Sequence, residues 1–213
     1  MTIRKALYGC LLLLAGSISS STLAGGTLLI IGDSLSDAYG MARESGWAAQ
    51  LENRLGAEYT VINASISGDT TASGLNRLSP LLAQRQPDWL LIILGGNDGL
   101  RALSPNQLRS NLERMIELAQ DAGIEVALMQ IRLPPNLGPA YLRRFEGVYP
   151  ELAEQHGITL LPFFLESVFD RPGMMMDDGI HPTVEAQELM LNALWPSLRA
   201  WMNGEWRTEA PVQ

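Results

Sequence analysis

The apolar run Leu28-Leu29-Ile30-Ile31 stops abruptly at Gly32-Asp33-Ser34-Leu35-Ser36, and this stretch decides how the rest of the chain is interpreted. A short run of leucine and isoleucine that ends at a glycine is typical of a buried strand in a parallel sheet. The residues after such a strand lie at the carboxyl edge of the sheet, where open α/β sheets bind their ligands. Ser34 is therefore a candidate nucleophile, although a serine that caps the next helix is the commoner use of such a residue.

Downstream of this stretch, apolar runs alternate with amphipathic segments. After a first strand over 27–31, further strands are predicted over 58–62, 88–94, 124–131 and 158–161. Helices are predicted over 46–55, around the leucines of 75–82, and over 105–123, 141–156 and 183–201. Strands separated by helices of this length form βαβ units. We therefore expect an α/β fold with a parallel sheet and helices on both faces, in one domain over 25–213 with a loosely attached tail from about residue 203.

The first 24 residues have the pattern of a secretory signal peptide. Arg4 and Lys5 come before an apolar segment over 6–15, a serine-rich stretch follows, and the leader ends at Thr22-Leu23-Ala24. A membrane-spanning helix needs about 20 apolar residues, roughly twice the length of this segment. We therefore expect a protein exported to the bacterial periplasm, without an integral membrane anchor, whose mature chain starts near Gly25.

The composition of the mature chain excludes several kinds of chemistry. The only cysteine, Cys10, lies in the leader, so the mature chain has no disulfide, thiol nucleophile or cysteine-ligated metal. The leader also contains Arg4 and the only lysine, Lys5, so its removal changes the net charge from −8 to −10. An acidic, lysine-free chain does not fit nucleic-acid binding or adsorption to anionic membranes. It also excludes Schiff bases, Ser-Lys dyads and phosphate-loop chemistry, each of which needs a lysine.

Two further polar blocks follow predicted strands and belong to the same edge of the sheet. Asn63-Ala64-Ser65-Ile66-Ser67-Gly68 follows the second strand, and Gly95-Gly96-Asn97-Asp98-Gly99 follows the third. Glycines in such blocks let main-chain N–H groups approach a ligand closely. Each block alone also has the composition of an ordinary turn after a strand. Together with Ser34, they place a hydroxyl, main-chain donors and an amide side chain at one edge of one sheet.

The chain has two histidines, and their surroundings differ. His156 precedes Gly157 at the predicted end of a helix, where a favourable interaction with the helix C-terminus explains it sufficiently. His181 lies in the loop Met176-Asp177-Asp178-Gly179-Ile180-His181-Pro182, before the last helix. A serine nucleophile needs a neighbouring base, and Asp178 is close enough in sequence to accept from the His181 ring and fix its tautomer. An acidic turn with Pro182 opening the next helix would explain each residue of this loop separately. It does not explain why an aspartate, a histidine and a proline occur together.

These four blocks resemble those of the SGNH (GDSL-type) hydrolases, and within that class the bacterial periplasmic thioesterase, protease and lysophospholipase group. The motifs are Gly-Asp-Ser-Leu-Ser at 32–36, Asn-Ala-Ser-Ile-Ser-Gly at 63–68, Gly-Gly-Asn-Asp at 95–98 and Asp-Gly-Ile-His-Pro at 178–182. The resemblance runs from about Leu28 to the last helix. It implies a three-layer α/β/α sandwich with a flavodoxin-like, five-stranded parallel sheet in the order 2-1-3-4-5.

The same resemblance implies the roles of the site residues. Ser34 would be the nucleophile, His181 the base and Asp178 its orienting carboxylate. Gly68 and Asn97, with the main chain of Ser34, would form the oxyanion hole. Asp33 and Asp177 match no position of the family triad, and we interpret both as structural or electrostatic.

The substrate is predicted from two apolar segments, 133–145 and 163–176, which are rich in proline, aromatic residues and methionine. Adaptable apolar loops beside a serine site suit an acyl chain of variable length. For about half of these residues, ordinary core packing is the better explanation. We predict that Leu133, Pro134, Tyr141 and Phe164 bind substrate. The resemblance implies small-molecule esters, acyl thioesters and lysophospholipids, hydrolysed through an acyl-enzyme.

Two other functions stay open on the sequence alone. A carbohydrate O-acetyl esterase would use the same triad with a short acyl pocket. A non-enzymatic flavodoxin-like binding module would need a phosphate-binding loop after the first strand, and Gly-Asp-Ser-Leu-Ser has too few glycines and hydroxyls for one. With two histidines and no cysteine in the mature chain, we expect no catalytic zinc and no cofactor. We also expect a monomer.

Overall fold

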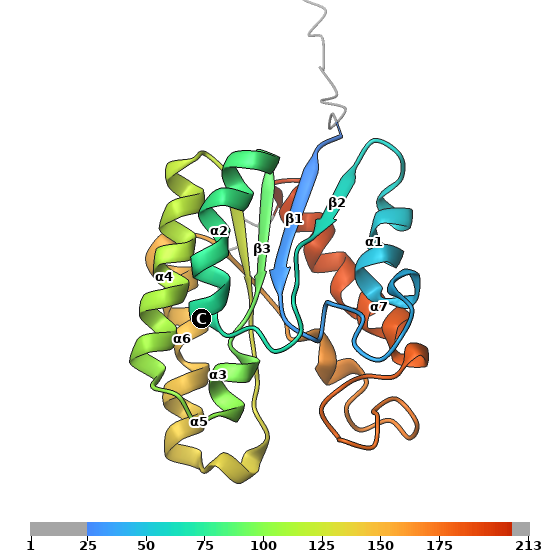
Figure 1. The fold of residues 1–213 in the computed structure, drawn as a ribbon, viewed down its shortest axis with the longest axis vertical. Helices are drawn as coiled ribbons and strands as arrows, with labels where there is room; N and C mark the ends of the chain where they lie inside the picture. Colours follow the sequence, from blue (N-terminus) through green and yellow to red (C-terminus); the bar gives the residue numbers. More distant parts are fainter. Residues whose placement is uncertain (1–24, 206–213) are drawn as a thin grey trace, which may run out of the picture.

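The computed structural model describes residues 25–205, and its centre is a sheet of five parallel strands (Figure 1). The strands are β1 Thr27–Gly32, β2 Thr60–Asn63, β3 Trp89–Ile93, β4 Glu125–Met129 and β5 Thr159–Leu161. Their order is β2-β1-β3-β4-β5, which confirms the predicted topology. The predicted signal peptide lies outside the described residues, as do residues 206–213 of the predicted tail.

The central strands are apolar because both of their faces are covered. Every side chain from Leu28 to Ile31 in β1 is completely buried, as is every side chain from Leu90 to Ile93 in β3. The pairing of these strands continues to their ends, where Gly32 lies opposite Ile93. Because all five strands are parallel, the segments that follow them meet at one edge of the sheet.

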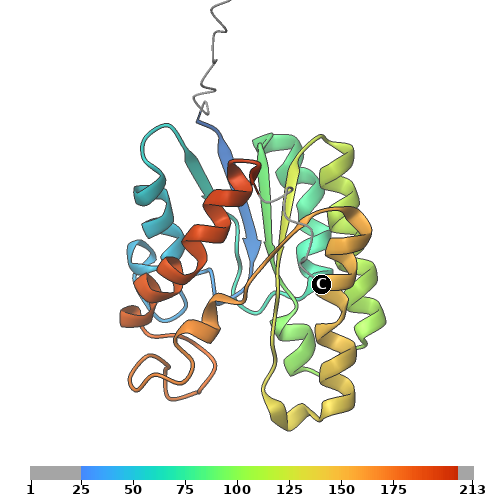
Figure 2. The same cartoon turned by 180° about the vertical axis from the view of Figure 1, so that it is seen from behind.

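Helices cover the two faces of the sheet as separate layers (Figures 1 and 2). One layer consists of α1 (Trp47–Leu55) and α7 (Val184–Met202), which contact each other. The other contains α2 (Thr71–Arg85), α4 (Pro105–Asp121) and α6 (Val148–His156). As predicted, α4 begins with Pro105 in its first turn, where a missing N–H costs nothing. The predicted three-layer α/β/α sandwich is therefore confirmed.

The predicted single helix over 141–156 is wrong, because the chain forms two helices there. The first is α5 (Pro139–Glu146), and α6 begins two residues after it ends. Pro150 has no N–H to donate to the carbonyl of Glu146, so the ladder lacks one hydrogen bond at this point, which favours a break. That carbonyl accepts instead from the side-chain amide of Gln130, at 3.3 Å.

Four short helical segments were not predicted. They are α3 (Gly96–Leu100), where the sequence suggested only a turn, and the 3₁₀ segments η1 (Arg43–Ser45), η2 (Pro135–Leu137) and η3 (Phe164–Ser167). Their one to two turns are too short to show a hydrophobic period. Across residues 25–205, no helix combines the length and the apolar character that crossing a membrane requires.

Candidate active site

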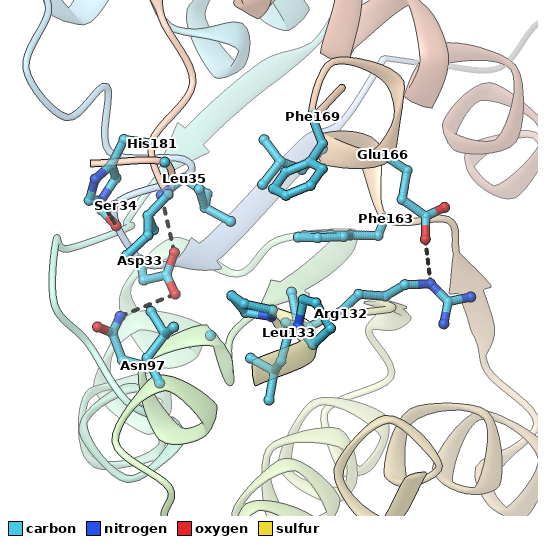
Figure 3. A pocket seen from close by; sticks show the side chains of 18 of the residues that line it. Asp33, Ser34, Leu35, Asn97, Arg132, Leu133, Phe163, Glu166, Phe169 and His181 are labelled. Carbon is cyan, nitrogen blue, oxygen red and sulfur yellow. Dashed lines mark hydrogen bonds and ion pairs between the residues drawn. The ribbon is translucent and has the colours of Figure 1, made fainter. Parts of the chain in front are cut away.

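Ser34, His181 and Asp178 form a chain of hydrogen bonds at the carboxyl edge of the sheet. The Oγ atom of Ser34 lies 2.8 Å from Nε2 of His181, and Nδ1 of the same ring lies 2.6 Å from Oδ2 of Asp178. Figure 3 shows the side chains of Ser34 and His181 side by side at one end of a pocket. An imidazole that bridges a hydroxyl and a carboxylate in this way is the geometry of an activated serine.

The loop that carries His181 is closed by its own hydrogen bonds. The N–H of Met176 donates to the carbonyl of His181 at 2.8 Å, and the N–H of Thr183 donates to Met174 at 2.9 Å. Within this loop, Oδ1 of Asp178 accepts from the N–H groups of Ile180 and His181, both at 2.9 Å. The His181 side chain, followed by these two N–H donors, lowers the pKa of Asp178 to about 2. The carboxylate is therefore ionised throughout the neutral range.

The loop that carries Ser34 is held by the segments around it. The indole N–H of Trp47 donates to the carbonyl of Leu35 at 3.0 Å, and the side-chain amide of Asn63 donates to Ser36 at 2.6 Å. These bonds connect the serine loop to α1 and to the last residue of β2. The residues that follow Ser34 are thus held by hydrogen bonds, although they lie in an irregular segment.

The predicted oxyanion-hole residues are connected to the serine through their chain neighbours. The side-chain amide of Asn97 donates to the carbonyl of Asp69 at 3.0 Å and to Oδ2 of Asp33 at 3.3 Å. Because Asp33 precedes Ser34 and Asp69 follows Gly68, these two bonds bring Asn97 close to both residues. Donation by Asn97 to a substrate oxygen would exchange one of these two bonds.

Gly68 is a glycine for conformational reasons. Its φ of +85° lies in the left-handed region, and a Cβ there would meet nothing within 4 Å. The hydrogen bonds of the described residues include none from the main-chain N–H of Gly68 or of Ser34. Both groups are thus free to donate to a ligand.

A buried polar cluster lies beneath Asn97, and the sequence did not reveal it. Asp98 accepts from the main-chain N–H of Thr71 at 2.9 Å and from its hydroxyl at 2.6 Å. The amide of Asn111 in turn donates to the Thr71 hydroxyl at 2.9 Å. These contacts connect α3 to the first turn of α2 and to α4. Because Asn97 precedes Asp98 in α3, they also fix the position of Asn97.

Asp33 is a buried carboxylate next to the serine. It is only 3% exposed, and this burial raises its pKa to about 6. Hydrogen bonds from the Leu35 N–H and the Asn97 amide, together with the positive charge of a protonated His181, partly offset the effect of burial. The carboxylate points toward Asn97 in Figure 3, not toward the His181 ring.

A largely apolar pocket of about 470 Å³ opens beside Ser34 and His181. It extends past Leu133 and Phe163 to Arg132 and Glu166, which form an ion pair at its far end (Figure 3). Its apolar wall contains Leu35, Leu100, Ile131, Leu133, Pro134, Pro135, Phe163, Leu165, Phe169 and Ile180. A pocket of this size and polarity suits an acyl chain that lies with its carbonyl at the serine.

Two of the four predicted substrate-binding residues line this pocket and two do not. Leu133 and Pro134 are part of the wall. Tyr141 is not, because it packs against Phe145 and its hydroxyl donates to the carbonyl of Leu103 at 2.8 Å. Phe164 is also outside the wall, because it is only 2% exposed and packs against Trp47. The neighbouring Phe163 faces the pocket instead.

The second histidine has the placement that the sequence predicted. His156 ends α6, and Gly157 caps the helix in the left-handed conformation. Its ring lies 3.5 Å from the carboxylate of Glu113, away from the pocket residues. Among residues 25–205, no group of three or more histidine, cysteine, aspartate or glutamate side chains is arranged to hold a metal ion.

The position of the serine in its motif defines the class of hydrolase. In α/β-hydrolases the nucleophile lies in a Gly-x-Ser-x-Gly turn, whereas Ser34 lies in Gly-Asp-Ser-Leu-Ser. The parallel sheet and this motif therefore define a serine hydrolase of the SGNH class. The model of the GDSL-like lipase/acylhydrolase family matches residues 30–189, and the chain belongs to this family.

Known proteins of this family are similar along most of the chain. The sequence is 48% identical to "Esterase TesA" of Pseudomonas aeruginosa, over 91% of this chain and 96% of that protein. It is 46% identical to "Thioesterase 1/protease 1/lysophospholipase L1" of Escherichia coli K12, over 84% of this chain and 86% of that protein. A crystal structure of TesA, 49% identical, has a TM-score of 0.79 and covers 82% of this chain and 99% of its own.

Proposed function

We propose that this chain hydrolyses acyl esters and thioesters, with Ser34 as nucleophile, His181 as general base and Asp178 as the residue that orients the base. The observation that carries this proposal is the pair of contacts on one imidazole, 2.8 Å to Ser34 Oγ and 2.6 Å to Asp178 Oδ2. Only with this alignment can Nε2 take the serine proton while Nδ1 keeps its own.

The reaction follows from the positions of these groups. Nε2 of His181 takes the hydroxyl proton of Ser34 as Oγ attacks the substrate carbonyl. The N–H groups of Ser34 and Gly68 and the Asn97 amide stabilise the resulting oxyanion. The protonated His181 then gives its proton to the leaving alcohol or thiol, and an acyl-enzyme forms on Ser34. Water, deprotonated by the same ring, attacks the acyl-enzyme, and the protonated ring returns a proton to Ser34 as the acid leaves.

The shape of the pocket supports acyl chains longer than acetyl. Its apolar wall continues from Leu35 at the serine to Phe163 and Phe169, which leaves room for several methylene groups. A carbohydrate O-acetyl esterase would not need this wall, so we do not favour that alternative. The names of the relatives support esters, thioesters and lysophospholipids as substrate classes.

We also infer that the protein is exported and acts in the periplasm. The support is the leader over residues 1–24, with its two basic residues, short apolar segment and Thr22-Leu23-Ala24 end. The N-terminal sequence of the protein from the periplasmic fraction of an expressing bacterium should begin near Gly25. An intact leader in the cytoplasmic fraction would contradict export.

A hydrolysis screen tests the proposed activity. The wild-type protein is assayed with nitrophenyl esters from acetyl to dodecanoyl and with the matching acyl thioesters, next to His181→Ala and His156→Ala. We expect hydrolysis to favour chains longer than acetyl, kcat to fall by several orders of magnitude in His181→Ala, and little change in His156→Ala. Equal losses in the two variants, or activity on acetyl substrates alone, would contradict the proposal.

A further inference from the structure

Tyr39 covers one face of the His181 ring. The two ring centroids are 4.1 Å apart and the ring planes differ by 24°, which is a stacked arrangement. Both ring nitrogens of His181 already have partners, so the ring face is the remaining surface through which the protein can hold the imidazole. Resting on the proposed function, we propose that Tyr39 is a positioning residue that keeps the imidazole in the plane joining Ser34 to Asp178.

The backbone around Tyr39 is shaped to place this side chain. Ala38 has a φ of 55° and Gly40 a φ of 72°, so left-handed residues stand on both sides of Tyr39. This conformation is unfavourable for alanine, and residues held in it are concentrated at functional sites. The Ala38 side chain lies close to the backbone of Gly46, where an added Cβ would be only 3.0 Å from the Ala38 Cβ.

The segment before Tyr39 is tied to its surroundings, so the stack does not depend on a freely moving loop. Oδ2 of Asp37 accepts from the N–H and from the hydroxyl of Ser67, both at 2.9 Å. On the other side, a Cβ at Gly40 would lie 3.2 Å from Cε of Met176, in the loop that carries His181. Tyr39 thus lies where the serine loop and the histidine loop meet.

The exposure of the two partners shows which of them the stack serves. The Tyr39 residue remains 45% exposed, whereas the His181 side chain is only 16% exposed. Tyr39 is thus the more exposed partner of the stack, and its ring covers one face of the His181 ring against water. Shielding is needed here because the Asp178 side chain is itself 41% exposed, so water can compete for its hydrogen bond with Nδ1.

The stack also fits the charge that develops during the reaction. His181 becomes an imidazolium when it takes the serine proton, and the face of a tyrosine ring attracts a cation. The charged and titratable groups around this imidazolium are Asp178 on its own loop and Asp33 and Tyr39 on the loop after β1. Of these, Tyr39 is the group that acts through its ring face, which a phenylalanine would preserve.

The test compares Tyr39→Leu with Tyr39→Phe, and uses Tyr59→Leu as the control. Tyr59 pairs with Trp89 at the opposite end of the sheet, so its loss removes an aromatic pair away from the site. We expect Tyr39→Leu to lower kcat by about three- to tenfold, with KM within about twofold of wild type. Tyr39→Phe and Tyr59→Leu should both keep kcat within about twofold.

A second readout uses the resting enzyme without substrate. The proton on Nδ1 of His181, in its short bond to Asp178, should give a resolved downfield proton NMR resonance in the wild type and in Tyr39→Phe. Faster exchange with water should broaden this resonance in Tyr39→Leu. Tyr39→Gln serves as a second variant, with the same expectations, if Tyr39→Leu does not fold.

Several results would overturn the positioning role. One is wild-type kcat together with a sharp Nδ1 resonance in Tyr39→Leu or Tyr39→Gln. Another is an effect of these variants on KM alone. A third is a loss of kcat in Tyr39→Phe equal to that in Tyr39→Leu. Failure of the proposed function gives a different result, because hydrolysis would then survive in His181→Ala while the NMR comparison would still report on the stack.

Discussion

The carboxylate of Asp33 accepts a hydrogen bond from the side-chain amide of Asn97 at 3.3 Å, immediately beneath the serine that faces His181. The buried carboxylate of Asp33 is thus paired with a neutral amide and not with a cation. Burial makes the negative charge of this carboxylate energetically unfavourable. The same bond orients the one side-chain donor that we assign to the oxyanion hole. The stability of the fold and the chemistry of the site are coupled at this pair.

Replacement of Asp33 by asparagine should change the stability of the protein in a pH-dependent way. The pKa of Asp33 is raised from 3.8 to about 6 in the folded state, so its favourable contribution is complete below about pH 3.8 and lost as the pH rises through about 6. Asp33→Asn does not lose stability in this window. Its free energy of unfolding relative to wild type should therefore increase between pH 4 and pH 7.5, by up to about 3 kcal/mol. Urea denaturation at the two pH values measures this, and a pH-independent difference would contradict it.

Replacement of Asn97 by alanine should lower kcat with little effect on KM. In the proposed mechanism the Asn97 amide donates to a charge that exists only in the transition state, and loss of one such donor costs about 10²- to 10³-fold in kcat. The control is Asn76→Ala, on the exposed side of α2. Single-turnover acylation by the folded variants gives the comparison. A kcat within a few-fold of wild type would remove Asn97 from the oxyanion hole.

Replacement of Asp178 by asparagine should cost far more activity than the same change at Asp177. An amide at position 178 no longer fixes the tautomer of His181, which can lower kcat by up to about 10⁴-fold. Asp177 is the matched control, since it is the adjacent aspartate of the same loop and lies outside the triad. Because the pKa of Asp178 is about 2, its protonation should not contribute to any loss of wild-type activity above about pH 4. Similar kinetics of the two variants would show that Asp178 does not orient the base.

Alanine substitutions at Leu133 and Phe164 should separate the pocket wall from the core. Leu133→Ala removes part of the wall, so kcat/KM should fall by about tenfold for octanoyl esters and much less for acetyl esters. Phe164→Ala should instead lower the free energy of unfolding by about 3 to 5 kcal/mol and leave the chain-length preference unchanged. A chain-length series together with thermal denaturation measures both effects. An altered preference in Phe164→Ala would place that residue at the substrate after all.

The predictable part of the molecule is the part that local sequence controls. The strands β1 and β3 are continuous apolar runs, and the carboxyl ends of parallel strands must meet, so the sequence alone assigns Ser34 and Asn97 to one edge of the sheet. The spacing of Asp178 and His181 is equally informative, because a three-residue separation in a tight loop lets one side chain reach the other.

The remaining features depend on contacts between distant segments. Phe163 and Phe164 are chemically identical neighbours, and in an irregular segment no period tells which faces the pocket. The bond between Asp98 and Thr71 joins residues far apart in the sequence. The stack of Tyr39 on His181 joins two loops through a conformation that alanine rarely adopts. The missing donor of Pro150, which favours the helix break near Gly147, is a local property of the sequence, but Pro80 and Pro196 lie inside continuous helices, so a proline alone does not predict such a break.

The most direct test of Ser34 as the nucleophile is covalent labelling with a fluorophosphonate, followed by mass spectrometry of the digested protein. The wild type and the Ser36→Ala variant, which changes a nearby serine, should each carry one label. The label should lie on Ser34 within the digested peptide. Folded Ser34→Ala, checked by circular dichroism, should take up no label and hydrolyse no ester. Label on a different residue, or ester hydrolysis that persists in folded Ser34→Ala, would contradict the assignment of the nucleophile and with it the proposed mechanism.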